Sequence, residues 1–235
     1  MKDKIRSWLQ LFRAQNENLR YCKVIPKLDD EETVSYIVGA LLGDGNLIKV
    51  KSKICNGHDY QIRLKSKDEE FIQSFAMSLR RIGLRPYITK IRLKRKNPNW
   101  SNCWEVRVRS KSFYYFLKTL DFTTLGKSYR CLIAFLKGLF EAEGCFNPHR
   151  YFDKRRRKLY TKYIVDISNN NLALVMFVAQ LLKDLGFHPW IRTVRNKSGT
   201  INYRVCLSRK DEVKRFLEAI NPCIPRKKWQ EIGCS

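Results

Sequence analysis

Hydrophobic and polar residues follow two different periods along this chain, and the two periods alternate. Stretches with apolar residues three and four positions apart, the spacing of one helix face, occur at 36–45 and 71–83 and again at 135–144 and 174–186. Between them lie stretches in which apolar and basic residues alternate one by one, which is typical of strands with one buried face. The order in each half is helix, two strands, helix, two strands, helix. This order predicts an α+β fold, because single helices separate pairs of neighbouring strands.

The chain contains an internal repeat. The stretch 71–88 matches 174–191, with Gly83 and Gly186 as the glycines that end the two helices. Four positions of the first apolar helix also return at one constant separation, namely Gly39 as Gly138, Gly43 as Ala142, Asp44 as Glu143 and Gly45 as Gly144. We therefore predict two related αββαββα repeats. The expected division is an N-terminal extension (1–33), a first repeat (34–125) and a second repeat with a C-terminal tail (126–235).

Both repeated helices end in an acid followed by a glycine. Small residues four positions apart leave one face of each helix bare, so that two helix backbones can pack closely. Gly45 and Gly144 are expected to end their helices in the left-handed conformation. An acid is unfavourable at a helix C-terminus, which is already negative, and a divalent cation would remove the repulsion between two such ends. Asp44 and Glu143 are therefore predicted metal ligands, and solvated surface acids are the alternative.

These residues resemble a known family. The stretches 37–45 (IVGALLGDG) and 136–144 (LKGLFEAEG) are both similar to the LAGLIDADG motif of homing endonucleases, with Leu42 in place of the motif's first acid. The resemblance is to single-chain members, which implies a monomeric enzyme that makes a double-strand break in one long DNA site with Mg²⁺ or Mn²⁺. It also implies that the repeats pack through their motif helices and that their antiparallel sheets form a DNA-binding saddle. The carbonyls of Gly43 and Ala142 are then expected to complete the metal coordination.

The same resemblance implies a basic residue near each acid. Lys67 aligns with the lysine of this region in related enzymes, and Lys65 is the alternative. The matching segment of the second half has Asn170 instead, and an amide cannot supply a positive charge beside a developing oxyanion. We therefore expect the two DNA strands to be cut at unequal rates. The alternative is a chain that has lost one of its two activities.

Basic residues of one sign alternate with apolar residues in the strands of the first half. This alternation predicts a sheet with one apolar face and one positively charged face, which can hold phosphates and read bases in the major groove, and a merely solvated face is the alternative. In the second half Tyr160, Asp166, Val194 and Cys206 interrupt the basic faces, so the halves are expected to read different half-sites. The basic run 154–158 is expected in a hairpin turn that holds phosphates. The predicted DNA contacts are Lys49, Lys51, Lys53, Gln61, Arg63, Lys65, Lys90, Arg92, Lys94, Lys96, Arg107, Arg109, Arg155, Arg156, Lys158, Lys162, Arg192 and Arg204.

Composition favours a nucleic-acid partner. The chain has 47 Lys and Arg against 22 Asp and Glu, a formal charge of +25, so a polyanion is the expected partner. The longest apolar stretches, near 131–140 and 172–182, are too short to span a bilayer, and the N-terminus lacks the layout of a signal peptide. We expect an intracellular protein, in the cytoplasm or nucleoid of a prokaryote, with an organellar origin as the alternative. It is expected to act on double-stranded DNA without a membrane or a protein partner. The eight cysteines have no zinc-finger or disulfide-framework spacing and are expected to be free thiols, mostly buried.

Two other functions fit the same scaffold. An RNA-binding maturase would use the basic surface on intron RNA; the two acids argue against a maturase-only role but leave a dual role open. A transcription regulator usually carries a separate DNA-binding domain, and the sequence shows no helix-turn-helix extension. The absence of flanking splicing blocks favours an intron-encoded or free-standing gene over an intein.

Overall fold

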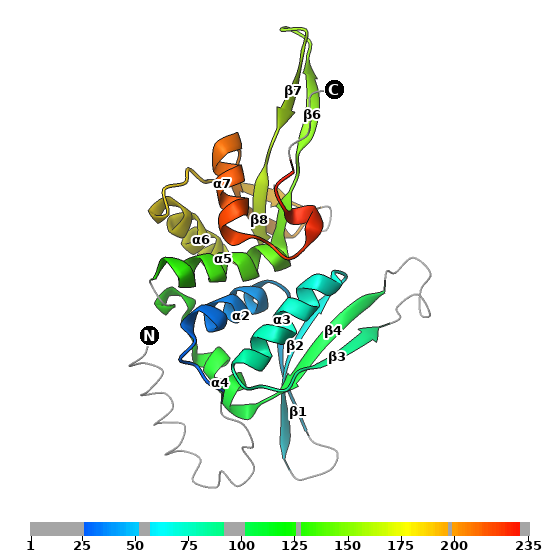
Figure 1. The fold of residues 1–235 in the computed structure, drawn as a ribbon, viewed down its shortest axis with the longest axis vertical. Helices are drawn as coiled ribbons and strands as arrows, with labels where there is room; N and C mark the ends of the chain where they lie inside the picture. The colour runs from blue at the N-terminus through cyan, green and yellow to red at the C-terminus, as the bar shows by residue number, and fades with distance from the viewer. Residues whose placement is uncertain (1–25, 52–56, 92–101, 126–127, 197–198, 231–235) are drawn as a thin grey trace. The chain divides into compact units, whose positions relative to one another are not determined.

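A computed structural model describes residues 26–51, 57–91, 102–125, 128–196 and 199–230 (Figure 1). The chain groups into two compact units, Met1–Gly138 and Leu139–Ser235. Among the residues predicted to contact DNA, four lie outside the described residues: Lys53, Arg92, Lys94 and Lys96. Most of the predicted N-terminal extension lies outside them as well.

The first repeat has the predicted order of elements. They are α2 (Glu31–Asp44), β1 (Gly45–Lys51), β2 (His58–Ser66), α3 (Glu69–Arg81), β3 (Tyr87–Ile91), β4 (Cys103–Arg109), α4 (Lys111–Thr119) and the short 3-10 helix η3 (Phe122–Thr124). The four strands form one antiparallel sheet in the order β1-β2-β4-β3. The α+β fold predicted from the alternating periods is thus confirmed.

Local sequence signals explain where these helices begin and end. The side chain of Asp30 accepts a hydrogen bond from Thr33 N at 3.0 Å at the start of α2, and Ser110 does the same for Phe113 N at 3.2 Å at the start of α4. Just after α3 the chain turns at Gly83, which has a φ of +82°. Only glycine adopts this conformation at little cost, so the predicted glycine end of α3 is confirmed.

The helices of the first repeat cover one face of its sheet. Alternate residues of the two central strands, Ile62 and Leu64 on β2 and Val106 and Val108 on β4, are at most 2% exposed. They lie in the same hydrophobic core as the apolar face of α3, whose buried residues are Phe71, Ile72, Phe75, Ala76 and Leu79. The residues between the buried ones, such as Arg63, point to the other face of the sheet. We call this the outer face.

The second repeat differs from the prediction in its first hairpin. Its elements are α5 (Tyr129–Glu143), β5 (Gly144–Phe146), β6 (His149–Asp153), β7 (Lys158–Lys162), β8 (Val165–Asn169), α6 (Leu172–Asp184), β9 (Trp190–Arg195), β10 (Ile201–Leu207), α7 (Lys210–Ile220) and the 3-10 helix η4 (Pro225–Lys227). The sheet order is β5-β8-β10-β9, and β6 pairs with β7 in a separate two-stranded sheet. Four strands thus replace the expected two. Pro148 explains the division, because it has no N–H group to continue the ladder.

The structure also tests the glycine prediction for the second half and the prediction for the cysteines. Gly186, just after α6, has a φ of +76°, which confirms the second predicted glycine end.

The cysteines described as free thiols are Cys103, Cys131, Cys145, Cys206 and Cys223. Cys131 and Cys206 are buried, Cys103 and Cys223 are half-buried, and Cys145 is exposed, so the expectation of mostly buried thiols is wrong for these five. Within the described ranges, no helix is long and apolar enough to cross a membrane.

One polar contact joins two elements of the second unit. Glu212, in the first turn of α7, accepts hydrogen bonds from the backbone N of His188 at 3.0 Å and pairs with its Nδ1 at 2.6 Å. Burial acts to raise the pKa of Glu212, but the hydrogen bonds from His188, together with nearby Arg209, outweigh it and hold the pKa below 4.5. The carboxylate therefore ties the turn before β9 to the start of α7.

Candidate metal-binding helix ends and nucleic-acid interface

The two motif acids occupy the same place in their repeats. Asp44 is the last residue of α2 and is exposed, and Glu143 is the last residue of α5 and is half-buried. Burial raises the pKa of Glu143 above its ordinary value, and the nearby ammonium of Lys227 opposes this only in part. A carboxylate that has lost hydration in this way is stabilised by a cation beside it.

The glycines after the acids are required for a different reason than the one predicted. Gly45 has an extended backbone, with φ −81° and ψ 152°, and Gly144 is not among the described glycines with positive φ. A Cβ on Gly45 would lie 2.5 Å from Leu41 Cα, and a Cβ on Gly144 would lie 2.5 Å from the carbonyl oxygen of Phe140. The left-handed cap prediction is wrong at both positions. Glycine is needed because each strand starts directly against the last helical turn, where a side chain has no room.

One small residue of the motif helices, Gly138, makes a close helix contact. Within the first unit, Gly138 of α5 lies against α2. A Cβ on Gly138 would overlap the carbonyl oxygen of Tyr36 and lie 2.8 Å from the backbone N of Ala40. The predicted packing of the motif helices is therefore confirmed at this position, and only glycine allows backbones to approach so closely.

Lys227 is a residue of the site that the sequence did not reveal. Its side chain is buried, and Nζ donates to the carbonyl oxygens of Phe140 at 2.9 Å and Glu141 at 2.8 Å in the last turn of α5. The backbone N of Cys223 also donates to Glu141 Oε1 at 2.7 Å, so the segment after α7 is joined to this helix end twice. Lys227 stands between two other basic residues, both exposed, and no local pattern distinguishes the buried one from its neighbours.

The donors at these helix ends fit a hard divalent cation. In the part of the chain that the structure describes, no group of three or more His, Cys, Asp or Glu side chains could hold a metal. The available protein ligands are therefore a carboxylate and backbone carbonyls at each helix end, with water and substrate phosphate left to supply the rest. Mg²⁺ and Mn²⁺ accept such an oxygen set, whereas zinc in a structural site prefers Cys and His.

Lys67 and Asn170 occupy equivalent places in the two repeats. Lys67 immediately precedes Asp68, the N-cap residue of α3, and Asn170 immediately precedes Asn171, the N-cap residue of α6. Both side chains are exposed. Lys65, the alternative to Lys67, lies on the outer face with its ammonium 3.3 Å from Glu105 Oε2. Lys67 is the lysine next to the helix cap, and its role beside the motif acid stays a prediction.

The basic residues of the first sheet are divided between its two faces. Residues directly opposite each other in an antiparallel pair share a face, and Arg63 lies opposite Arg107, on the outer face. Lys49 lies opposite Tyr60, and Lys90 lies opposite Trp104, over whose ring its Nζ sits at 4.8 Å. The predicted single positive face is therefore wrong for β1 and β3: Lys49, Lys51 and Lys90 lie on the face that the helices partly cover. Alternation alone could not reveal this, because shifting the pairing by one residue exchanges the two faces.

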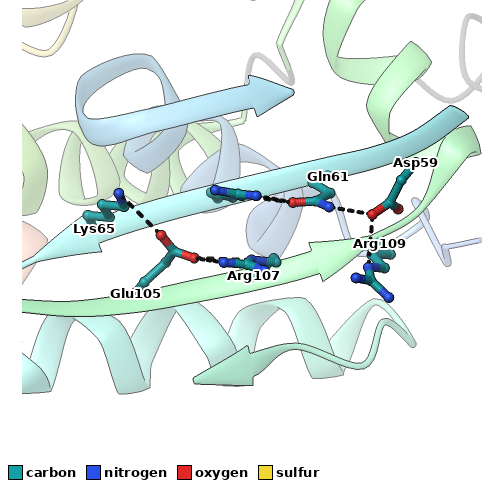
Figure 2. A network of polar contacts seen from close by, with 7 residues as sticks. Asp59, Gln61, Lys65, Glu105, Arg107 and Arg109 are labelled. Carbon is teal, nitrogen blue, oxygen red and sulfur yellow. Dashed lines mark hydrogen bonds and ion pairs between the residues drawn. The ribbon is translucent and has the colours of Figure 1, made fainter. Parts of the chain in front are cut away.

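A polar network orders the outer face between β2 and β4, as Figure 2 shows. Glu105 is 3% exposed, and its Oε1 accepts from Nε of Arg107 at 3.1 Å and from Nη2 at 2.6 Å. Burial acts to raise the pKa of Glu105, but Arg107 and Lys65 outweigh it, so the pKa lies below its ordinary value. The buried acid is therefore ionised at neutral pH and compensated by two cations.

The other half of the network is built on Gln61. This side chain is 4% exposed, and its Oε1 accepts from Arg63 Nε at 2.8 Å and also from Nη2 of the same residue. Its Nε2 donates to Asp59, whose carboxylate lies 3.1 Å from Nε of Arg109. Gln61 was predicted to contact DNA directly. In the free protein both polar groups of its amide are already hydrogen-bonded within the sheet, the carbonyl to Arg63 and the amino group to Asp59.

The second unit carries a weaker basic face, as its sequence indicated. Asp166 lies opposite Cys206 in the β8–β10 pair, and Arg204 lies opposite Arg192 in the β10–β9 pair. Arg204 Nη1 is 3.8 Å from Asp166 Oδ2, so part of the positive charge is neutralised within the sheet. Val194 is on the same face by alternation.

The β6–β7 hairpin confirms the predicted basic turn. Arg155 and Arg156 are exposed, and their backbone N atoms donate to Asp153 Oδ1 at 2.9 and 3.2 Å. Tyr151 stacks on Tyr160 across the hairpin, with the ring centroids 5.8 Å apart. The two predicted contacts on β7, Lys158 and Lys162, share a face with Tyr160.

Comparison with known proteins gives a consistent result. A model of the LAGLIDADG-like domain matches residues 31–121 and 130–221, which are most of the two repeats. The uncharacterized protein MJ0314 of Methanocaldococcus jannaschii is 34% identical over 179 residues, which are 73% of this chain and 62% of that protein. The homing endonuclease I-DmoI of Desulfurococcus mucosus is 29% identical over 200 residues, or 82% of this chain and 92% of that protein. The crystal structure of I-DmoI in complex with DNA and Mn has a TM-score of 0.57 at 26% identity and covers 81% of this chain and 96% of that chain.

Proposed function

The chain belongs to the LAGLIDADG-like domain family, and from this membership we propose that it is a site-specific DNA endonuclease. The proposed reaction is a double-strand break in one long, asymmetric DNA target by divalent-metal-dependent hydrolysis, and the proposed context is intron homing. The observation that carries the proposal is the retention of an acid as the last residue of both motif helices, Asp44 on α2 and Glu143 on α5. A scaffold kept only for binding has no need of acids at two unfavourable helix ends.

The chain's own residues divide the work as follows. Asp44 and Glu143, with the carbonyls of Gly43 and Ala142, would hold Mg²⁺ or Mn²⁺. The bound ions supply Lewis acidity toward the phosphate and an activated water. The exposed ammonium of Lys67 would stabilise negative charge that develops on the phosphate oxygens in the first half.

The DNA is held by the basic surfaces of both units. The outer face of the first sheet presents ordered arginines, and the β6–β7 turn presents exposed arginines suited to backbone phosphates. The outer face of the first sheet and the face of the second sheet that carries Asp166 and Arg204 differ in charge, so each repeat is suited to a different half-site. This supports an asymmetric target and a chain that needs no second copy.

The test is cleavage of a plasmid that carries a candidate uninterrupted host gene, with Mg²⁺ and with EDTA. The unmodified chain should linearise the plasmid only with Mg²⁺. Asp44→Asn and Glu143→Gln should abolish linear product while binding of the same DNA stays within a few-fold. Asp184→Asn is the matched control, since Asp184 is an exposed acid at the end of α6, outside the motifs. Full cutting by Asp44→Asn, or equal loss of cutting in Asp184→Asn, would contradict the metal-ligand assignment.

A further inference from the structure

Two arginines of the first sheet are held in the same unusual way. Arg63 on β2 and Arg107 on β4 are direct cross-strand partners. Each donates from Nε and Nη2 to one oxygen of the residue two places earlier on its own strand, Gln61 for Arg63 and Glu105 for Arg107. Both acceptors are nearly fully buried. The outer face thus presents two guanidinium groups side by side. In each group, the edge formed by Nε and Nη2 is hydrogen-bonded to the buried acceptor.

The fixed edge leaves the other edge of each guanidinium available. An arginine has five N–H donors, and the contacts with Gln61 or Glu105 use one on Nε and one on Nη2. Among the described residues, no hydrogen bond or ion pair engages Nη1 of Arg63 or of Arg107. The remaining donors on Nη1 and Nη2 form the fork that pairs with O6 and N7 of guanine in the major groove. A side chain that is already ordered loses less conformational entropy when it binds.

We propose that Arg63 and Arg107 read the guanines of two neighbouring G·C pairs in the half-site bound by the first repeat. Gln61 and Glu105 are then positioning residues, which keep their hydrogen bonds to Arg63 and Arg107 when DNA is bound. Directly opposite residues lie on strands about 4.8 Å apart, which is comparable with the rise of about 3.4 Å between base pairs. The inference rests on the proposed function, because it requires that this face bind duplex DNA.

The network itself argues against a phosphate role for this pair. If Arg107 swung out to a phosphate, Glu105 would keep a buried carboxylate with one of its two cations removed, which is costly. Arg109 shows the contrast, because its side chain is 70% exposed and makes one 3.1 Å contact to Asp59. Such an arginine can turn toward the backbone at little cost. The fixed pair is suited to specificity and Arg109 to general affinity.

Among the described residues, only the first repeat has an arginine pair held in this way. Arg192 and Arg204 are cross-strand partners in the second sheet, but Arg204 approaches Asp166 through Nη1 at 3.8 Å, and its Nε has no hydrogen-bond partner. In the second sheet Asp166 stands at the place of Arg63 relative to the following helix cap, and its cross-strand partner is Cys206. An acid accepts hydrogen bonds and does not donate to guanine. The two-guanine requirement should therefore appear in one half-site only, which gives the target a recognisable direction.

The experiment selects bound sequences from a random duplex library with the full chain in EDTA, so that no cleavage competes with binding. The unmodified chain should enrich targets with two neighbouring G·C pairs in one half-site. Arg63→Lys and Arg107→Lys keep the charge but lose the fork, and each should lose about tenfold or more of the preference at one of the two positions. Their affinities should keep the same slope against salt concentration, since the number of cations is unchanged. Arg109→Lys is the matched control and should leave every base preference unchanged.

Gln61→Met tests the positioning role, because it removes the acceptor of Arg63 and leaves Glu105 in place. Preference should weaken at the position read by Arg63 and not at the position read by Arg107. A general structural effect would weaken both. Two outcomes would overturn this inference: enriched half-sites without neighbouring G·C pairs, or Arg→Lys variants that bind all sequences equally more weakly. The proposed function would still stand in either case if the unmodified chain bound duplex DNA with a steep dependence on salt. If the unmodified chain bound no duplex DNA, both would fall.

Discussion

Lys227→Met tests the role of the buried ammonium at the end of α5. Methionine has a similar length and keeps the apolar packing of the side chain, but it cannot donate to the carbonyls of Phe140 and Glu141. The change therefore separates the two hydrogen bonds from the burial of the side chain. Lys228→Met is the matched control, because Lys228 is the next residue in the chain and is exposed.

The expected cost follows from the contacts. A hydrogen bond from a charged donor contributes about 1.5–3 kcal/mol, and each carbonyl left without its donor costs about 1–3 kcal/mol. Methionine avoids the desolvation of a buried ammonium, which offsets part of these losses. We therefore expect Lys227→Met to lower the free energy of unfolding by about 2–4 kcal/mol, and Lys228→Met to change it by less than about 0.5 kcal/mol.

Urea unfolding of the full chain without metal measures this difference. With a slope of about 2 kcal/mol per molar urea, the midpoint of Lys227→Met should fall by roughly 1–2 M. Lys227→Arg, which can still donate to both carbonyls, should recover part of the loss. Equal midpoints for Lys227→Met and Lys228→Met would refute the role of the two hydrogen bonds in holding this helix end.

Three further predictions concern rate, pH and packing. With the two DNA strands labelled separately, a time course should show a transient nicked duplex cut mainly in one strand, and Lys67→Ala should slow cleavage more than Asn170→Ala; equal strand rates with Lys67→Ala unchanged would remove both roles. Glu212→Gln should lower the free energy of unfolding at pH 7, since the lowered pKa beside His188 means that the carboxylate stabilises the fold above pH 4.5. In unfolding curves taken at several pH values, this deficit should shrink as the pH falls through the lowered pKa, and a deficit independent of pH would contradict it. Gly138→Ala should cost about 1–3 kcal/mol in urea unfolding because its Cβ meets backbone atoms of α2, and an unchanged midpoint would show that the helices can separate freely.

The sequence by itself determined the features that depend on local pattern. The order of helices and strands in the first repeat, the glycine ends at Gly83 and Gly186 and the duplication all follow from residue periods and repeated positions. The acids Asp44 and Glu143 are recognisable because an acid at a helix C-terminus is unfavourable and stands at the same place in both motif helices. Such signals lie within one helix or strand, or in the comparison of the two repeats, and do not depend on which elements pack against each other.

Only the tertiary structure decided which residues meet. The register of β1 and β3 puts Lys49 and Lys90 on the face opposite to Arg63, although all three alternate with apolar neighbours in the sequence. Gly45 is needed because β1 starts close against the last turn of α2, and not because its backbone is left-handed. Lys227 reaches α5 from a segment more than eighty residues away in the chain. Pairing register, backbone approach and long-range contacts are energies between distant parts of the chain, and a local pattern carries no information about the partner.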